Sequence, residues 1–212
     1  MISKWLGDLP FDDFRHVHFQ RAPLARSATA LDAVPMLTWR TVERLLRERV
    51  DHLVVRNARL IDTRVPDFGA AVELLENGCS LVLRRCERCD DGLRDLAGAI
   101  SSEMTGDVSV QVYVTPAGFH SFGWHYDCED VFIVQTLGVK DYFLRENTVN
   151  PRPTLAAMPR DMQFERETTP ISGSLLAAGD CLYVPRGWWH VAKCISTSLS
   201  ISAGVLAPDA RG

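Results

Sequence analysis

Residues 112–127 read VYVTPAGFHSFGWHYD, and residues 179–190 read GDCLYVPRGWWH. The first stretch carries a His-x-Asp pair, His125 and Asp127, and the second ends at His190. On an extended strand, side chains two positions apart point to the same face, so the first two side chains can reach one ion. A third ligand from another strand completes the two-His-one-carboxylate set of non-haem Fe(II) oxygenases, which leaves coordination positions open. The pattern therefore indicates a metalloenzyme.

Further segments surround this pattern: Tyr113-Val-Thr-Pro-Ala-Gly, Asp130-Val-Phe-Ile-Val-Gln and Gly179-Asp-Cys-Leu-Tyr-Val-Pro-Arg-Gly. Together with His125-Tyr-Asp, they resemble the JmjC/cupin-like 2-oxoglutarate oxygenases, and most of all the ribosomal oxygenases, which hydroxylate ribosomal proteins. Weaker likeness extends over nearly the whole chain. The resemblance implies a double-stranded β-helix, a barrel of the jelly-roll type. The ribosomal oxygenases carry dimerisation and winged-helix regions after this barrel, whereas the present sequence stops at Gly212, just beyond the last expected strand.

The resemblance also implies the cofactors. Fe(II) is expected on His125, Asp127 and His190, with 2-oxoglutarate and O2 as cosubstrates and with succinate and CO2 as co-products. The presence of Asp127 favours hydroxylation over halogenation, which needs that ligand position for a halide. Because the C-terminal regions are not in this sequence, the expected substrate is broad: a protein or peptide side chain, or an amino-acid-like metabolite.

Lys140 follows a turn at Gly138 and is expected to begin the next strand. In the resembling family a basic residue at this position pairs with the distal carboxylate of 2-oxoglutarate, a task that suits a compact ammonium group. Near the C-terminus, serine and apolar residues alternate, so Ser198, Ser200 and Ser202 share one strand face. That face either meets water or lines the barrel. In a barrel, Ser198 and Ser200 are candidates for the cosubstrate and Ser202 for the substrate.

Gln111 and Tyr113 lie two positions apart on another expected strand and share a face. Related ribosomal oxygenases have Asn and Tyr at these positions, in contact with the substrate residue. We therefore expect Gln111 and Tyr113 to contact the substrate, with a core tyrosine as the alternative. The additional methylene of glutamine moves the amide tip, so the same substrate is not implied.

Composition narrows the class of protein. The 212 residues suffice for one large domain, and 46% apolar with 24% charged residues is ordinary for a globular protein. A net charge of −4 argues against a broadly basic nucleic-acid binder. Neither a signal peptide nor a membrane-spanning run is recognisable, so a cytoplasmic protein is expected. Of the six cysteines, Cys86 and Cys89 form a single C-x-x-C pair, which lacks the second pair of a zinc site.

The order of expected elements favours an α+β fold. Thr38 is a helix N-cap before an apolar stripe, and further helices are expected over residues 70–76 and 91–104. From Val108 the pattern changes to short strands separated by turns, whereas residues up to about 60 show no strong strand alternation. One domain over residues 1–212 is expected, with a mainly helical flank and the first strands in 1–106 and the barrel core in 107–206.

Two other functions fit parts of the pattern. A metal-dependent cupin enzyme that does not use 2-oxoglutarate would typically offer a further ligand, such as another histidine or a glutamate. A catalytically silent module would keep the fold for binding alone, but the intact ligand set and Lys140 argue against it. The sequence does not indicate an oligomeric state.

Overall fold

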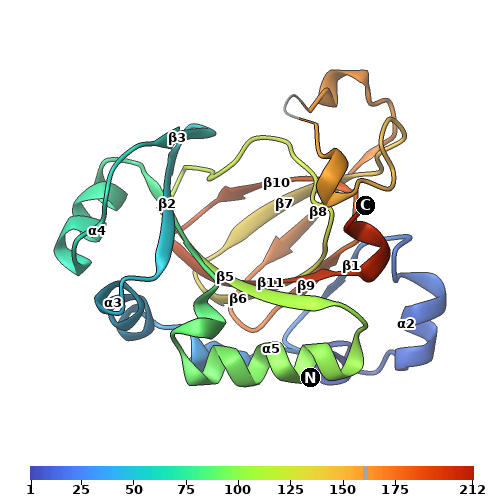
Figure 1. Cartoon of the computed structure of the whole chain (residues 1–212), viewed down its shortest axis with the longest axis horizontal. Helices are drawn as coiled ribbons and strands as arrows, with labels where there is room; N and C mark the ends of the chain where they lie inside the picture. Colours follow the sequence, from blue (N-terminus) through green and yellow to red (C-terminus); the bar gives the residue numbers. More distant parts are fainter. Residues whose placement is uncertain (160–161) are drawn as a thin grey trace.

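The computed structural model describes residues 1–159 and 162–212, which fold into two antiparallel sheets with helices outside them (Figure 1). The helices are α1 (Ile2–Trp5), α2 (Phe11–Val17), α3 (Trp39–Arg47), α4 (Phe68–Glu76) and α5 (Asp91–Glu103). The strands are β1 (Leu24–Arg26), β2 (Asp51–Arg56), β3 (Arg59–Ile61), β4 (Ser80–Arg84), β5 (Asp107–Thr115), β6 (Asp130–Leu137), β7 (Lys140–Arg145), β8 (Ile171–Leu176), β9 (Cys181–Val184), β10 (Trp189–Cys194) and β11 (Ser198–Leu206).

In the described part of the chain, eight strands form a large sheet in the order β1-β9-β6-β11-β5-β4-β2-β3. Three further strands form a small sheet in the order β10-β7-β8. The small sheet lies over the inner face of the large one, and α5 runs along the opposite face (Figure 1). Because strands distant in sequence are neighbours, β11 pairs with both β5 and β6. The two facing antiparallel sheets confirm the expected α+β jelly-roll fold.

Strand β11 shows how the sequence separates the two faces of the large sheet. Leu199, Ile201 and Ala203 are fully buried in the core shared with the helices. The alternating serines point the other way, toward the small sheet, as a strand period of two requires. A second apolar cluster, which includes Ile133 of β6 and Leu144 of β7, packs the two sheets together. The expected serine face therefore lies between the sheets.

The expected helices are confirmed with small shifts at their ends. Thr38 caps α3 by accepting a hydrogen bond from the Thr41 backbone N–H, and α4 and α5 cover the expected residues. The first strands within residues 1–106 are β1 to β4, and three of them begin before residue 60, where the sequence shows no strong alternation. Strand β2 pairs with β4 on one side and with β3 on the other. Its extended structure therefore depends on these neighbours more than on alternation of polar and apolar residues in its own sequence.

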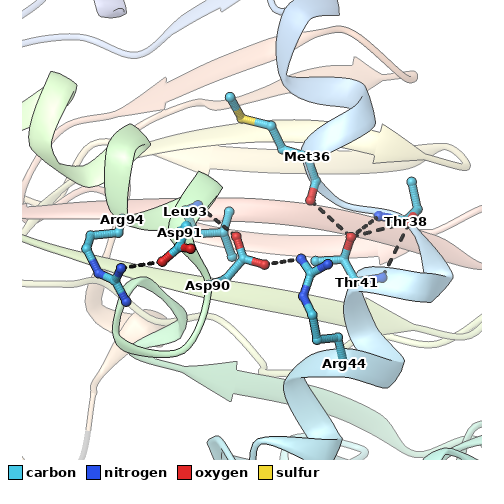
Figure 2. A network of polar contacts seen from close by, with 8 residues as sticks. All are labelled: Met36, Thr38, Thr41, Arg44, Asp90, Asp91, Leu93 and Arg94. Carbon is cyan, nitrogen blue, oxygen red and sulfur yellow. Dashed lines mark hydrogen bonds and ion pairs between the residues drawn. The ribbon is translucent and has the colours of Figure 1, made fainter.

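A polar network joins α3 to the start of α5 (Figure 2). Asp90 is the N-cap of α5, and its carboxylate accepts a hydrogen bond from the Leu93 backbone N–H at 2.9 Å. The same carboxylate, which is 5% exposed, also forms an ion pair with Arg44 of α3. Asp91, one residue later, is exposed and pairs with Arg94 on the same helix. Asp90 thus links two helices, whereas Asp91 acts only within one.

Replacing Asp90 by alanine is expected to lower the free energy of unfolding by roughly 1–3 kcal/mol, because both the helix cap and a partly buried charged hydrogen bond are lost. Urea unfolding at constant m-value measures this change. The matched variant Asp91→Ala removes an exposed i,i+3 pair, so its loss is expected to stay below about 1 kcal/mol. Equal losses in the two variants would contradict the linking role of Asp90.

Candidate metal centre

The two histidines of the metal pattern are held beside each other by the backbone. His190 lies on β10, and His125 forms an isolated antiparallel bridge with it. The His125 N–H donates to the His190 carbonyl at 3.2 Å, and the His190 N–H donates to the His125 carbonyl at 2.8 Å. Asp127 follows two residues after His125, and its carbonyl accepts a hydrogen bond from the Gly187 N–H at 2.9 Å. Local pairing therefore brings segments sixty residues apart into register.

One ligand atom from each of His125, Asp127 and His190 can be chosen so that all lie within 4.8 Å of one another. The His190 Nε2 lies 3.5 Å from the Asp127 Oδ2, and the centres of the two imidazole rings are 4.2 Å apart. This is a spacing at which three donors can converge on one ion with bonds of about 2 Å. His120, in the preceding loop, is not part of this cluster.

Hydrogen bonds fix the orientation of both rings. The His125 Nδ1 lies 2.8 Å from the Gly123 carbonyl, and the His190 Nδ1 lies 3.0 Å from the Trp188 carbonyl. A carbonyl only accepts, so each Nδ1 carries the proton and each Nε2 keeps its lone pair. Burial, reinforced by His125, lowers the pKa of His190 to about 4, so the ring is neutral near pH 7. Neutral, oriented imidazoles beside a carboxylate fit a divalent metal ion.

A cavity adjoins the three ligands between the two sheets. Its walls mix polar with apolar and aromatic side chains from both sheets and from the loop before His125. The remaining lining residues are Tyr113, Ser121, Phe122, Val131, Ile133, Lys140, Tyr142, Ala192, Ser200 and Ser202. The cavity thus combines apolar walls with several polar and ionisable groups beside the metal cluster, as small-molecule sites do.

Lys140 is the buried cation of this cavity. The turn before it uses Gly138 at φ +75°, where an added Cβ would lie 2.2 Å from the Thr197 carbonyl oxygen. Lys140 begins β7, as expected, and is 3% exposed. Its Nζ donates to the Ser200 Oγ at 3.0 Å, and no ion pair of Lys140 occurs among residues 1–159 and 162–212. Burial lowers the pKa of Lys140, a cost that an anionic ligand in the cavity would offset.

Of the other expected site residues, some line the cavity and some lie outside its lining. Ser200, Ser202 and Tyr113 line the cavity. Ser198 is fully buried beside the Cys194 thiol, 2.9 Å from its Sγ, and is not a lining residue, unlike the expected cosubstrate contact. Gln111 also lies outside the lining, where its Oε1 accepts from the Tyr113 hydroxyl at 3.4 Å. Ser198, the first residue of β11, and Gln111, in the middle of β5, therefore both lie outside the cavity lining.

Tyr113 lies nearer to the buried cation than its expected role requires. The Lys140 Nζ is 5.6 Å from the centre of the Tyr113 ring, within the range of a cation–π contact. The ring also packs edge-on against Phe122, which in turn contacts His125. Tyr113 therefore spans from the lysine to the aromatic residue beside a metal ligand.

Tyr142 also lines the cavity, although its sequence pattern was not interpreted as part of the site. It lies two positions after Lys140 on β7, and this spacing puts both side chains on one strand face. Burial raises the pKa of Tyr142, so its phenol stays protonated, and Tyr142 lines the cavity together with Lys140 and Ser200. The spacing of two residues between Lys140 and Tyr142 was the sequence pattern from which this cavity position could have been predicted.

Other titratable residues lie outside the cluster. Glu129 is half-buried, and burial together with Asp127 raises its pKa to about 7, but its carboxylate is not among the three clustered ligands. Cys86 donates to the Leu83 carbonyl, and burial raises the pKa of its thiol. A protonated, buried thiol is a poor nucleophile and a poor metal ligand. No helix in the described part of the chain has the length and apolar character needed to cross a bilayer.

Comparisons with known proteins agree with this geometry. A family model described as the JmjC domain matches residues 90–212. The chain is 33% identical over 121 residues to "Bifunctional lysine-specific demethylase and histidyl-hydroxylase NO66" of Dictyostelium discoideum, covering 55% of this chain and 23% of that protein. It is 41% identical over 86 residues to "Ribosomal oxygenase 2" of Rattus norvegicus, covering 41% of this chain and 18% of that protein.

Solved structures share the fold. The Escherichia coli ycfD structure superposes with a TM-score of 0.73 at 20% identity, over 95% of this chain and 54% of that one. The E. coli ribosomal oxygenase YcfD in complex with cobalt and 2-oxoglutarate gives a TM-score of 0.68 at 18% identity, over 95% and 52% of the two chains. The present chain thus spans about half the length of these structures, and a quarter or less of the curated relatives.

Proposed function

The chain belongs to the JmjC domain family, and from this membership we propose that it is an Fe(II)- and 2-oxoglutarate-dependent dioxygenase. Its reaction hydroxylates a substrate C–H bond and releases succinate and CO2. One observation carries the proposal: the buried Lys140, which forms no ion pair within residues 1–159 and 162–212, shares a cavity with the cluster of His125, Asp127 and His190. A metal ligand set alone fits many reactions, but a cation beside it selects an anionic cosubstrate.

In this proposal His125, Asp127 and His190 hold the iron, and Lys140 with Ser200 holds the distal carboxylate of 2-oxoglutarate. When bound, iron and 2-oxoglutarate supply the oxidising chemistry with O2. The protein orients both imidazoles through the backbone carbonyls, excludes water with apolar walls, and keeps the cosubstrate's charge compensated. Ser198 then acts behind the site, through the Cys194 thiol, and not by direct contact.

The substrate is a protein or peptide side chain, or an amino-acid-like metabolite, and Tyr113, Gln111 and Ser202 contribute to its recognition. Support comes from the cavity positions of Tyr113 and Ser202 and from the hydrogen bond between the Tyr113 hydroxyl and Gln111. The names of the relatives point the same way, since NO66 is described as a demethylase of lysine and a hydroxylase of histidine. A cytoplasmic location and a single domain over residues 1–212 belong to the same proposal.

Two experiments test the function. Conversion of 2-oxoglutarate to succinate that depends on Fe(II) separates this proposal from a cupin enzyme without 2-oxoglutarate and from a silent binding module. Mass spectrometry of candidate peptides and cell extracts then searches for a product heavier by one oxygen atom, about 16 Da. Succinate formation that is absent at every iron concentration, in a folded protein that is given extract, would contradict the proposal.

Replacing Tyr113 by phenylalanine is expected to reduce coupled hydroxylation several-fold, since a neutral hydrogen bond contributes about 0.5–1.5 kcal/mol. The ring next to Lys140 is kept, so the affinities for Fe(II) and 2-oxoglutarate should stay near those of the parent. Hydroxylated product is compared with succinate release once the substrate is identified. A parallel loss of 2-oxoglutarate affinity would move Tyr113 to the cosubstrate site, and no loss would return it to the core.

A further inference from the structure

Each histidine of the metal cluster is preceded directly by a tryptophan. Trp124 precedes His125, and Trp189 precedes His190. Successive side chains on a strand point to opposite faces, so His190, which faces the cavity, turns Trp189 of β10 away from it. Neither tryptophan lines the cavity, and Trp189 is 1% exposed. A segment that covers both tryptophan rings therefore lies next to both metal-binding histidines, on the side away from the cavity.

The cover comes from the connection between β7 and β8, drawn in orange in Figure 1 and described here over residues 146–159 and 162–170. The Phe164 ring stacks on the Trp124 ring, with centres 4.2 Å apart and planes inclined by 9°. The same ring meets Trp189 edge-on, with centres 5.4 Å apart and an angle of 78°. The Arg145 guanidinium lies 5.2 Å from the Phe164 ring centre. One phenylalanine thus bridges the neighbours of both ligands.

Glu167 fixes this connection to the barrel. Its buried carboxylate accepts hydrogen bonds from the Trp189 Nε1 at 3.1 Å, the Thr148 N–H at 2.8 Å and the Thr148 hydroxyl at 2.6 Å. Burial by itself would raise the pKa of Glu167, but the hydrogen bonds to its carboxylate have the larger combined effect. The net pKa is therefore lowered, and the charged form is favoured. On the other side, Tyr126 packs edge-on against Trp189 at 4.6 Å. The indole of Trp189 is therefore held in position from several directions.

We propose that Phe164 and Glu167 are positioning residues that set the spacing of the two histidine ligands from outside the cavity. The proposal rests on the metal site proposed above. The backbone joins the two ligand segments at an isolated bridge and at the hydrogen bond from the Gly187 N–H to the Asp127 carbonyl, so it constrains their separation less than a continuous ladder would. The stacked rings supply the missing constraint, because any change in the distance between Trp124 and Trp189 must disturb their shared contact with Phe164. Loss of a direct hydrogen-bond partner of a metal ligand commonly changes metal affinity by about 10–100-fold, so groups one contact further out are expected to act at the low end of that range.

The test uses Co(II) as the probe under anaerobic conditions. Phe164→Ala is expected to weaken Co(II) binding about tenfold and to change the visible absorption bands, which report coordination geometry. Phe164→Tyr keeps a flat ring and should restore both affinity and spectrum. Leu155→Ala removes an exposed apolar side chain from the same connection and serves as the control, with parental affinity expected. Glu167→Gln should lose less affinity than Glu167→Ala, because its amide oxygen still accepts from Trp189.

The unfolding midpoint is measured for every variant, and Phe164→Leu replaces Phe164→Ala if the latter does not fold. A parental affinity and spectrum in the folded variant that lacks the ring would overturn the positioning role. An equal affinity loss with an unchanged spectrum in the Leu155→Ala control would also overturn it, since the effect would then be general to the connection. Failure of the parent protein to bind Co(II) would instead refute the proposed metal site.

Discussion

Fe(II) affinity is expected to fall by more than about a hundredfold when His125, Asp127 or His190 is replaced by alanine, since even the outer partners of metal ligands typically contribute 10–100-fold. Each residue supplies one of three donor atoms lying within 4.8 Å of one another, and two donors do not hold the ion in the same way. Anaerobic titration with Fe(II) measures the loss. The loss of affinity is expected to come from the missing ligand atom alone, because each substitution leaves the barrel core in place.

The control is His120→Ala, which removes a histidine from the adjoining loop that does not belong to the cluster. It should bind Fe(II) like the parent. If the three ligand variants also bind like the parent, the assignment of the metal centre is wrong. If His120→Ala alone loses affinity, the ligand set must be redrawn to include that loop.

Loss of the Lys140 charge is expected to weaken 2-oxoglutarate about ten- to a hundredfold, because a hydrogen bond to a charged group contributes about 1.5–3 kcal/mol. Lys140→Met keeps most of the buried stem and removes only the ammonium group, so the cavity wall is preserved. Fe(II) affinity should change far less, since no metal ligand is altered. The measurement is a titration of the metal-loaded protein with 2-oxoglutarate.

Lys193→Ala is the matched control, since Lys193 is exposed and lies on the neighbouring strand beside the residue that pairs with Lys140. Its affinity for 2-oxoglutarate should be parental. An unchanged affinity in Lys140→Met would remove the lysine from the cosubstrate site and would leave its burial without a ligand to offset it. A loss of iron affinity as large as the loss of 2-oxoglutarate would indicate a disturbed cavity instead.

Much of the fold could be predicted because its signals are local. The Thr38 cap, the apolar stripe of α5 and the serine alternation of β11 each lie within a few turns or one strand. Strands β2 and β3 were not predicted, since their structure comes from pairing with each other and with β4. The closure of the barrel likewise depends on contacts between distant segments and entered through the family resemblance.

The candidate site divides in the same manner. A short motif made His125 and Asp127 recognisable. A turn placed Lys140 at the start of a strand, and the family resemblance gave that position its role. Phe164 and Glu167 could not be found, because nothing in their own neighbourhood marks them: they matter through contacts with tryptophans 22 or more residues away. Ser198 was assigned to the cosubstrate from alternation alone, which gives the correct face of β11 but not how far along that face the cavity extends.

The most direct test is calorimetric titration of 2-oxoglutarate into the anaerobic protein, with and without Fe(II). The proposed site places the metal and Lys140 in one cavity, so both should be needed for full affinity. The expected result is one 2-oxoglutarate bound per chain in the presence of Fe(II), with binding greatly weakened when the metal is omitted and in the Lys140→Met and Asp127→Ala variants. Binding that is equally strong without metal, or no binding with Fe(II) present, would contradict a 2-oxoglutarate-dependent iron enzyme.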